Sequence, residues 1–228
     1  MFKQRSHKKE LLDGDIIPQA DLYRNLYELN TINNWLGGYK ITFDALKKVL
    51  HGKQTIVLVD IGSGGGDTLK QIQKWSLKRN LDLKLYGIDL KQTCVDYSLE
   101  NNNTEITFIC DDYRSILDYI PKVDVIHASL FCHHLSENEI AELIEFCVLN
   151  KITLIVNDLE RNPIAYFAIK ILTALFSKSY LVKNDAPLSV LRGFKKREWE
   201  LMLVHSKAKK YSVTGKWAFR HEVIVYGE

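Results

Sequence analysis

The sequence has 228 residues, of which 46% are hydrophobic and 26% are charged, and its net charge is +3 at pH 7. These values are ordinary for a globular protein, and the length suits one α/β domain with an additional cap. The small, evenly spread charge argues against nucleic acid as a partner. The longest apolar run, 164–176, contains Lys170 and is too short to span a bilayer.

The compartment is predicted from the N-terminus and the cysteines. Charged residues near the start of the chain are not followed by an apolar segment, so no signal peptide is expected. The four cysteines are Cys94, Cys110, Cys132 and Cys147, and no two of them form a C-x-x-C pair. This pattern predicts reduced thiols in a cytoplasmic protein, without disulfides and without a metal site.

The first fifty residues have the pattern of two helices. Apolar and aromatic side chains recur at helical spacing from Leu22 to Trp35, and Gly37-Gly38 then interrupts the pattern. A second helix is predicted over about 43–50, ending near Gly52. We therefore predict a helical N-terminal cap over residues 1–52 and a main domain over 53–228. Simple packing on the edge of a sheet fits this cap, and the family resemblance described below implies closure over a substrate as the alternative.

Residues 55–67 read Thr-Ile-Val-Leu-Val-Asp-Ile-Gly-Ser-Gly-Gly-Gly-Asp. The β-branched and leucyl run predicts a strand that is buried on both faces of a parallel sheet. The glycines within 62–66 allow a sharp turn and a close approach of the backbone to a ligand. A helical pattern follows, so strand, glycine turn and helix form the first part of a nucleotide-binding unit. A dinucleotide fingerprint would need glycine at position 67, where the chain has Asp67.

Acidic residues end the next two predicted strands. The strand over 83–89 ends in Asp89, which lies beside the glycine turn and can accept hydrogen bonds from both hydroxyls of a ribose. Leu90 follows and could contact an adenine face. The strand over 106–110 is followed by Asp111-Asp112.

A pair of histidines follows the fourth predicted strand, 123–128. Ser136 and Glu139 form a capping box for the next helix, so His133 and His134 lie in the preceding loop. That loop is at the carboxyl edge of the sheet, where α/β proteins bind their ligands.

The remainder of the chain predicts one more parallel strand and a terminal hairpin. A strand over 151–158 is followed by Asn162-Pro163, which begins an apolar helix over 164–176. Residues 184–194 are predicted as a loop or short helix, which completes a helical insertion over about 162–194. A helix over 196–206 and two strands, 210–214 and 217–226, joined around Gly215, end the chain.

The pattern Asp60-x-Gly62-x-Gly64-x-Gly66 resembles motif I of the class I S-adenosylmethionine-dependent methyltransferases, and the resemblance extends over about 50–228. It implies a Rossmann-like α/β fold: a doubly wound seven-stranded sheet, mostly parallel, with a C-terminal antiparallel hairpin. It also implies S-adenosylmethionine as the cofactor. The cofactor-binding residues that it implies are Asp60, Gly62, Ser63, Gly64, Gly66, Asp89, Leu90, Asp112, Tyr113 and Ser129.

One departure from the family pattern concerns the adenine. In this family an acid after the third strand accepts a hydrogen bond from the adenine amino group, and the usual Gly-Asp-Ala pattern aligns that acid with Asp112. Asp111 stands where the family has glycine, which leaves the choice between the two carboxylates open.

A closer likeness is to bacterial small-molecule methyltransferases of the ubiquinone and menaquinone biosynthesis type. It depends on residues 33–38, on the histidine pair and on residues 186–190. It implies methyl transfer to O or C of a small hydroxylated aromatic, quinone-like or polyketide-like acceptor. Transfer from a sulfonium needs alignment and a proton acceptor. Our hypothesis makes His133 the base, with His134 as second choice, and gives Arg192 the role of holding the anion.

Two other functions remain as alternatives. A nucleotide-cofactor oxidoreductase is disfavoured by Asp67 and by the terminal hairpin. A methyltransferase-like binding subunit without activity is disfavoured by the intact glycine turn and Asp89. Residues 128–131 lack the motif of nucleic-acid amino-methyltransferases, and the Asn157-Asp158 pair is interpreted as a strand-end turn rather than a magnesium site. The apolar helix leaves a homodimer open.

Overall fold

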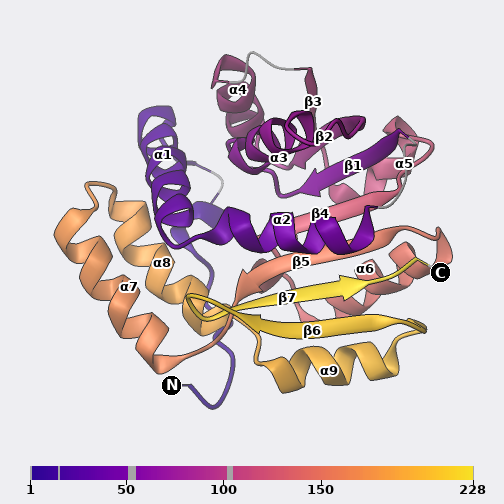
Figure 1. The fold of residues 1–228 in the computed structure, drawn as a ribbon. Helices are drawn as coiled ribbons and strands as arrows, with labels where there is room; N and C mark the ends of the chain where they lie inside the picture. Colours follow the sequence, from indigo (N-terminus) through magenta and orange to yellow (C-terminus); the bar gives the residue numbers. More distant parts are fainter. Residues whose placement is uncertain (1, 15, 51–54, 102–104, 228) are drawn as a thin grey trace.

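A mixed sheet of seven strands, in the order β3-β2-β1-β4-β5-β7-β6, forms the centre of the computed structural model, which describes residues 2–14, 16–50, 55–101 and 105–227 (Figure 1). The strands are β1 (Ile56–Ile61), β2 (Leu83–Asp89), β3 (Ile106–Cys110), β4 (Val125–Ser129), β5 (Thr153–Leu159), β6 (Tyr211–Lys216) and β7 (Arg220–Val225). The first five are parallel, and β7 is antiparallel to both β5 and β6. The doubly wound sheet with a C-terminal antiparallel hairpin is therefore confirmed.

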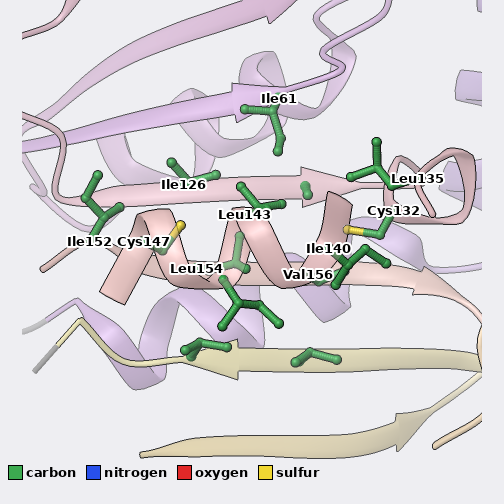
Figure 2. Close-up of a cluster of buried hydrophobic side chains, with 14 of the residues drawn as sticks. Ile61, Ile126, Cys132, Leu135, Ile140, Leu143, Cys147, Ile152, Leu154 and Val156 are labelled. Carbon is green, nitrogen blue, oxygen red and sulfur yellow. The ribbon is translucent and has the colours of Figure 1, made fainter. Parts of the chain in front are cut away.

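Helices cover both faces of the sheet. One face carries α2 (Gly38–Val49), α3 (Asp67–Leu77) and α4 (Gln92–Asn101), and the other carries α5 (Ile116–Tyr119), α6 (Glu137–Leu149) and α9 (Lys196–His205). Side chains alternate along each strand, so Leu58 packs towards α2 and α3 while Ile61 packs towards α6. Figure 2 shows the hydrophobic cluster between the sheet and α6, with Leu143 and Ile140 of α6 against β4 and β5.

The second lead-in helix belongs to the core. Ala45 and Leu46 of α2 are fully buried and share a hydrophobic cluster with Ile155 of β5. The helix begins at Gly38, earlier than predicted, because Gly37 adopts the left-handed conformation (φ 71°) and turns the chain directly into it. The boundary that we predicted at residue 52 lies outside the described residues, and α2 packs both on the sheet and against α1.

Four segments form a layer beyond the carboxyl ends of the parallel strands. They are η1 (Leu11–Asp13), α1 (Gln19–Trp35), α7 (Pro163–Phe176) and α8 (Tyr180–Arg192). Helix α7 packs on α8, and α8 contacts both α1 and η1 (Figure 1). The predicted insertion is therefore α7 and α8. Residues 184–192, predicted as a loop or short helix, are helical because Ser179 caps α8 and the helix accommodates Pro187.

The terminal hairpin turns later than predicted. Gly215 lies inside β6 and pairs with His221, and the turn occurs at 217–219. Ala218 and Phe219 have φ of 57° and 54°, as the two central residues of a tight hairpin turn require. The tip places Trp217 beside the layer formed by α1, α7 and α8. Among the described residues, none of the helices is long and apolar enough to cross a membrane.

Candidate active site

Two adjoining cavities lie at the carboxyl edge of the sheet. One, of about 400 Å³, extends over the turn after β1, and the other, of about 490 Å³, lies under α1, α7 and α8. The side chains that line both are Leu12, Leu29, Asn33, Leu130 and His134. Because these five residues belong to both walls, a group bound in one cavity would meet a group bound in the other beside His134 and Leu130.

The turn after β1 requires glycine for reasons of space and of backbone conformation. Gly62 has φ of 63°, and a Cβ on it would lie 2.2 Å from Cδ2 of Phe131. Gly64 and Gly66 also have positive φ, at 53° and 71°. Any side chain at position 62 would therefore both strain the backbone and displace Phe131 from the cavity wall.

Asp89 ends β2 beside this turn and lines the smaller cavity. One of its carboxylate oxygens accepts from the backbone N–H of Gly64 at 2.9 Å, and the other accepts from the N–H of Lys91 at 2.9 Å. Burial raises the pKa of the Asp89 carboxyl, and the two amides act against that rise. Each oxygen retains a lone pair for a further donor, such as a hydroxyl of a bound ribose.

The acids after β3 occupy the far wall of the same cavity. Asp112 begins the short helix η2 (Tyr113–Ser115) by accepting from the N–H of Arg114, and its second oxygen pairs with the Arg114 guanidinium at 2.9 Å. The Asp111 carboxylate accepts from the N–H of Asp112 and from the Tyr119 hydroxyl. Both carboxylates line the cavity, so the choice between them stays open.

The histidines sit in η3 (Cys132–His134), directly after β4. Nδ1 of His133 lies 2.7 Å from Oδ1 of Asp158, and Nδ1 of His134 lies 2.9 Å from Oδ1 of Asp13. The hydrogen bonds from His133 lower the pKa of Asp158 in spite of its burial, and hydrogen bonds from His134 and Arg192 hold that of Asp13 below its usual range, also against burial. An ionised carboxylate only accepts, so each ring donates from Nδ1, and in the neutral imidazole Nε2 is then the acceptor.

Glu10 faces both imidazoles. One carboxylate oxygen is 3.7 Å from Nε2 of His133 and the other is 3.9 Å from Nε2 of His134, while the two rings are 4.3 Å apart. Burial raises the pKa of Glu10 to about 7. Ser189 of α8 donates its hydroxyl to the same carboxylate at 2.8 Å. Glu10, His133 and His134 thus form a titratable cluster in the wall of the larger cavity.

The spacing of this cluster would also fit a divalent ion, because its ligand atoms lie within 4.8 Å of one another. The Glu10 carboxylate, however, already has a donor in Ser189 and lies 3.8 Å from Nε of Arg192. Its charge is therefore compensated by the protein, and the cluster is better suited to receiving a proton than to binding a metal.

The larger cavity is otherwise mostly apolar, with α1, α7 and the β6–β7 hairpin supplying most of its wall. Three of its lining residues carry buried polar atoms without a hydrogen-bond partner among the described residues: Nδ2 of Asn25, Oδ1 of Asn33 and Nε of Arg220. Burial lowers the pKa of Arg220 to about 10. Unpaired buried donors and acceptors in an apolar chamber are groups that a bound molecule can satisfy.

Comparison with known proteins agrees with this geometry. Residues 58–150 match the model of a family described as a methyltransferase domain. Those residues form a class I methyltransferase domain. S-adenosylmethionine is the cofactor of this class. No curated protein sequence gives a significant match to the chain.

Solved structures share the fold at low sequence identity. The plantazolicin methyltransferase BpumL, in complex with a monoazolic desmethylPZN analog and SAH, has a TM-score of 0.64 at 16% identity, covering 90% of each chain. A SAM dependent methyltransferase from Aquifex aeolicus has a TM-score of 0.58 at 16% identity, covering 92% of this chain and 98% of that one. A putative O-methyltransferase from Nostoc punctiforme PCC 73102 has a TM-score of 0.57 at 10% identity, covering 88% and 60%.

The methyltransferase domain brings most of the predicted cofactor residues into one wall. Those that line the smaller cavity are Gly62, Ser63, Gly64, Asp89, Leu90, Asp112, Tyr113 and Ser129. Asp60 and Gly66 do not line it. Gly66 precedes the first residue of α3 as its N-cap. Because side chains alternate along a strand, Asp60 lies on the α2 face of β1. Its carboxylate is 2.7 Å from Nδ1 of the buried His127. The structure thus places the Asp60 carboxylate outside the lining of the smaller cavity, and its contact with the cofactor stays a prediction.

Arg192 does not occupy the place that we predicted. It lines neither cavity, and its guanidinium donates to the carbonyl oxygens of His133 and His134 and to Asp13 at 2.7 Å. The guanidinium N–H groups are engaged in these hydrogen bonds, so they are not available to bind the anion of a methyl acceptor. Arg192 therefore holds the η3 turn in position, and the buried guanidinium in the cavity wall is that of Arg220.

The sequence analysis did not single out four residues that line the cavities or hold their histidines: Glu10, Asp13, Asp158 and Arg220. The sequence does contain an acid at the end of β5, and an acid in that position next to a histidine loop is a signal for Asp158. Glu10 and Asp13 carry no such signal, because they reach the site from an N-terminal segment with no recognisable pattern.

Proposed function

We propose that this protein transfers the methyl group of S-adenosylmethionine to O or C of a small hydroxylated aromatic, quinone-like or polyketide-like acceptor. The observation that carries the proposal is the pair of adjoining cavities: the glycine turn and Asp89 line one, an apolar wall with a histidine cluster forms the other, and His134 belongs to both. Bond exchange between two bound molecules requires this kind of contact.

The cofactor would occupy the smaller cavity. Backbone amides at 62–66 would face its amino-acid portion, Asp89 would accept from the ribose hydroxyls, and Asp111 or Asp112 would meet the adenine edge with Leu90 against its face. Leu130, whose φ of 53° is unusual for a leucine, lines both cavities and would lie where the methyl donor and the acceptor meet.

His134 is the base in this proposal, in place of our first choice, His133. Of the two histidines, His134 lines both cavities and His133 lines the larger one alone. Nδ1 of His134 donates to Asp13, so that Nε2 of the neutral ring can accept. In the reaction, the acceptor O–H bond or activated C–H bond breaks and its proton moves to Nε2 of His134. The oxygen or carbon forms a bond to the methyl group, and the methyl–sulfur bond breaks to leave neutral S-adenosylhomocysteine.

Three side chains would support that proton transfer. Arg220 would hold the acceptor oxygen as negative charge develops on it, since its Nε is buried in the cavity wall without a partner among the described residues. His133, fixed by Asp158, and Glu10 would stabilise the imidazolium that forms on His134.

The ligands and activities described for the similar proteins do not identify the acceptor of this one. BpumL was solved with analogues of desmethylPZN, and the Nostoc protein is described only as a putative O-methyltransferase. The acceptor class proposed here depends instead on the apolar wall and the small set of polar groups in it. All four cysteines are free, which fits the cytoplasmic location that we also propose.

Calorimetric titration with S-adenosylmethionine, S-adenosylhomocysteine and NAD tests the cofactor, and turnover with a panel of phenols tests the reaction. We expect the two sulfur compounds to bind and NAD not to bind. Binding of NAD alone would favour an oxidoreductase. Cofactor binding without transfer to any acceptor would favour a binding subunit that lacks activity.

A further inference from the structure

Helix α7 presents an apolar face that the other described residues leave mostly exposed. Ile164, Phe167, Ile171 and Leu175 form one stripe at helical spacing, and they are 65%, 55%, 59% and 70% exposed. Only Ile169 and Thr173 of the fourteen residues are buried. Figure 1 shows α7 as the outermost helix of its layer. Exposed apolar surface of this extent marks an interaction site.

The charged side chains of the segment that carries the stripe are of one sign, and Glu28 of α1, at the end of α7, already accepts hydrogen bonds from the Ser177 hydroxyl and from the N–H groups of Lys178 and Ser179. From 163 to 184 the charged residues are Lys170, Lys178 and Lys183, all exposed, and there is no acid. The N-terminal Phe2 packs against Tyr166 and Phe167, which places the exposed Lys3 beside the same helix. An apolar stripe flanked by lysines is complementary to a lipid surface with anionic headgroups.

The opposite side of α7 lines the larger cavity. Ala165, Ala168, Ile169 and Leu172 belong to its wall. Trp217, at the tip of the β6–β7 hairpin, lines the same cavity and is 79% exposed. Tryptophan is favoured at a membrane interface, where one part of its ring system is apolar and the other is wet. One helix thus separates the proposed acceptor chamber from the exposed apolar surface.

We propose that α7 docks on the surface of an anionic lipid bilayer and that the acceptor is an amphiphile, a hydroxylated ring with an apolar tail, which enters the cavity from that bilayer. The identity of the acceptor rests on the proposed function, whereas the docking does not. The helix lies in the interface and does not cross it, with its stripe among the acyl chains and its lysines at the phosphates.

A second copy of the chain fits the stripe less well. In a two-fold symmetric contact, α7 would meet the same helix of the other copy. Lys170 would then be buried near its equivalent without an acid on either helix to pair with it, and an unpaired buried charge is costly. At a lipid surface the same side chain extends to a phosphate and keeps its charge in water.

Flotation with lipid vesicles tests the docking. The full chain is mixed with phosphatidylcholine vesicles containing no phosphatidylglycerol or an increasing share of it, and the bound fraction is measured. We expect binding that rises with anionic lipid, and a loss of at least about tenfold in the double variant Ile171→Glu/Leu175→Glu. The variant Lys170→Gln/Lys178→Gln should lose about fivefold per lysine on anionic vesicles only.

The matched control is Leu201→Glu/Val204→Glu on α9, which changes two exposed apolar residues that line neither cavity. It should float like the unmodified chain, and all variants should bind S-adenosylhomocysteine equally. Failure of the unmodified chain to float overturns the proposal. A dimer in analytical ultracentrifugation that Ile171→Glu/Leu175→Glu dissociates would assign the stripe to a second copy and also overturn it.

A series of 4-alkylphenols of increasing chain length tests the acceptor. Calorimetry should show affinity rising by about three- to fourfold per methylene until the cavity is filled. Affinity that does not depend on the tail would refute the amphiphile while leaving methyl transfer intact. Vesicle binding without transfer to any acceptor would instead refute the proposed function and leave the docking intact.

Discussion

The two cavities are built in different ways although they share a wall. The smaller one is lined mainly by turns that directly follow β1, β2, β3 and β4, so its residues come from loops of one sheet edge. The larger one is assembled from η1, α1, α7, α8 and the terminal hairpin, which are far apart in the chain. In the function that we propose, the sheet edge would hold the cofactor and the added helices would determine the acceptor.

The largest expected effect is the loss of cofactor binding when the smaller cavity alone is altered. Gly62→Ala places a methyl group 2.2 Å from Phe131 at a backbone φ of 63°. We expect affinity for S-adenosylhomocysteine to fall on the order of 100-fold by calorimetry, because the backbone strain and the displaced ring act at the same turn. Gly215→Ala is the control, since a Cβ there meets nothing within 4 Å. Unchanged affinity in Gly62→Ala would remove the turn from the cofactor site.

The next effect should fall on the reaction and spare the cofactor. His134→Gln removes the proposed base at the boundary of the cavities. We expect turnover at saturating cofactor to fall by up to about 100-fold, the lower end of what a positioned base supplies, with unchanged affinity for S-adenosylhomocysteine. His205→Gln, an exposed histidine on α9, should keep full activity. A large loss in His133→Gln with none in His134→Gln would reverse our assignment.

The same assay distinguishes a base from a metal site. Treatment with EDTA should leave turnover unchanged, because the Glu10 carboxylate is already compensated by Ser189 and Arg192. Activity that is lost on chelation and restored by zinc would reassign Glu10, His133 and His134 as metal ligands.

A smaller effect is expected at the guanidinium in the acceptor chamber. Arg220→Gln should raise KM for a phenolic acceptor by about tenfold, because one charge-assisted hydrogen bond to the acceptor oxygen is lost. Affinity for S-adenosylhomocysteine should not change. Arg79→Gln, which removes a guanidinium over Trp75 far from either cavity wall, serves as the control. An effect on the cofactor but not on the acceptor would show that Arg220 supports the fold instead.

The smallest effect concerns stability and depends on pH. Glu10 has its pKa raised by burial from 4.5 to about 7, so the folded chain binds a proton that the unfolded chain has released. Its contribution to the free energy of unfolding is therefore complete below pH 4.5 and is lost as the pH rises through 7. Glu10→Gln, a neutral mimic, should match the unmodified chain near pH 4.5 and exceed it at pH 8 by up to about 3 kcal/mol in urea unfolding. Equal stabilities at pH 8 would contradict the raised pKa of this buried acid.

The contrast also explains what could be predicted from the sequence. The glycine turn, Asp89 and the histidine loop follow strands with a clear apolar pattern, so their positions at one sheet edge follow from the order of the strands. The titratable cluster in the wall of the larger cavity depends on long-range contacts, because His134 pairs with Asp13 across 121 residues and Glu10 pairs with Ser189 across 179. No local pattern records contacts of that range.

The side chains of Asp60 and Arg192 point away from both cavities for the same physical reason. Asp60 fits the family pattern, but the alternation of β1 turns it towards α2, where it pairs with the buried His127. Arg192 is in the right layer, but its guanidinium is used by the carbonyls of η3. Position along the chain predicted the neighbourhood of each residue, and the direction of each side chain was decided by packing.

Titration of the chain with S-adenosylhomocysteine is the most direct test of the central claim that the cavity over the glycine turn holds the cofactor and the adjoining chamber does not. The account predicts one site per chain, which Asp89→Ala abolishes and which His134→Gln leaves unchanged. No binding to the unmodified chain, or binding that survives Asp89→Ala and is lost in His134→Gln, would contradict it.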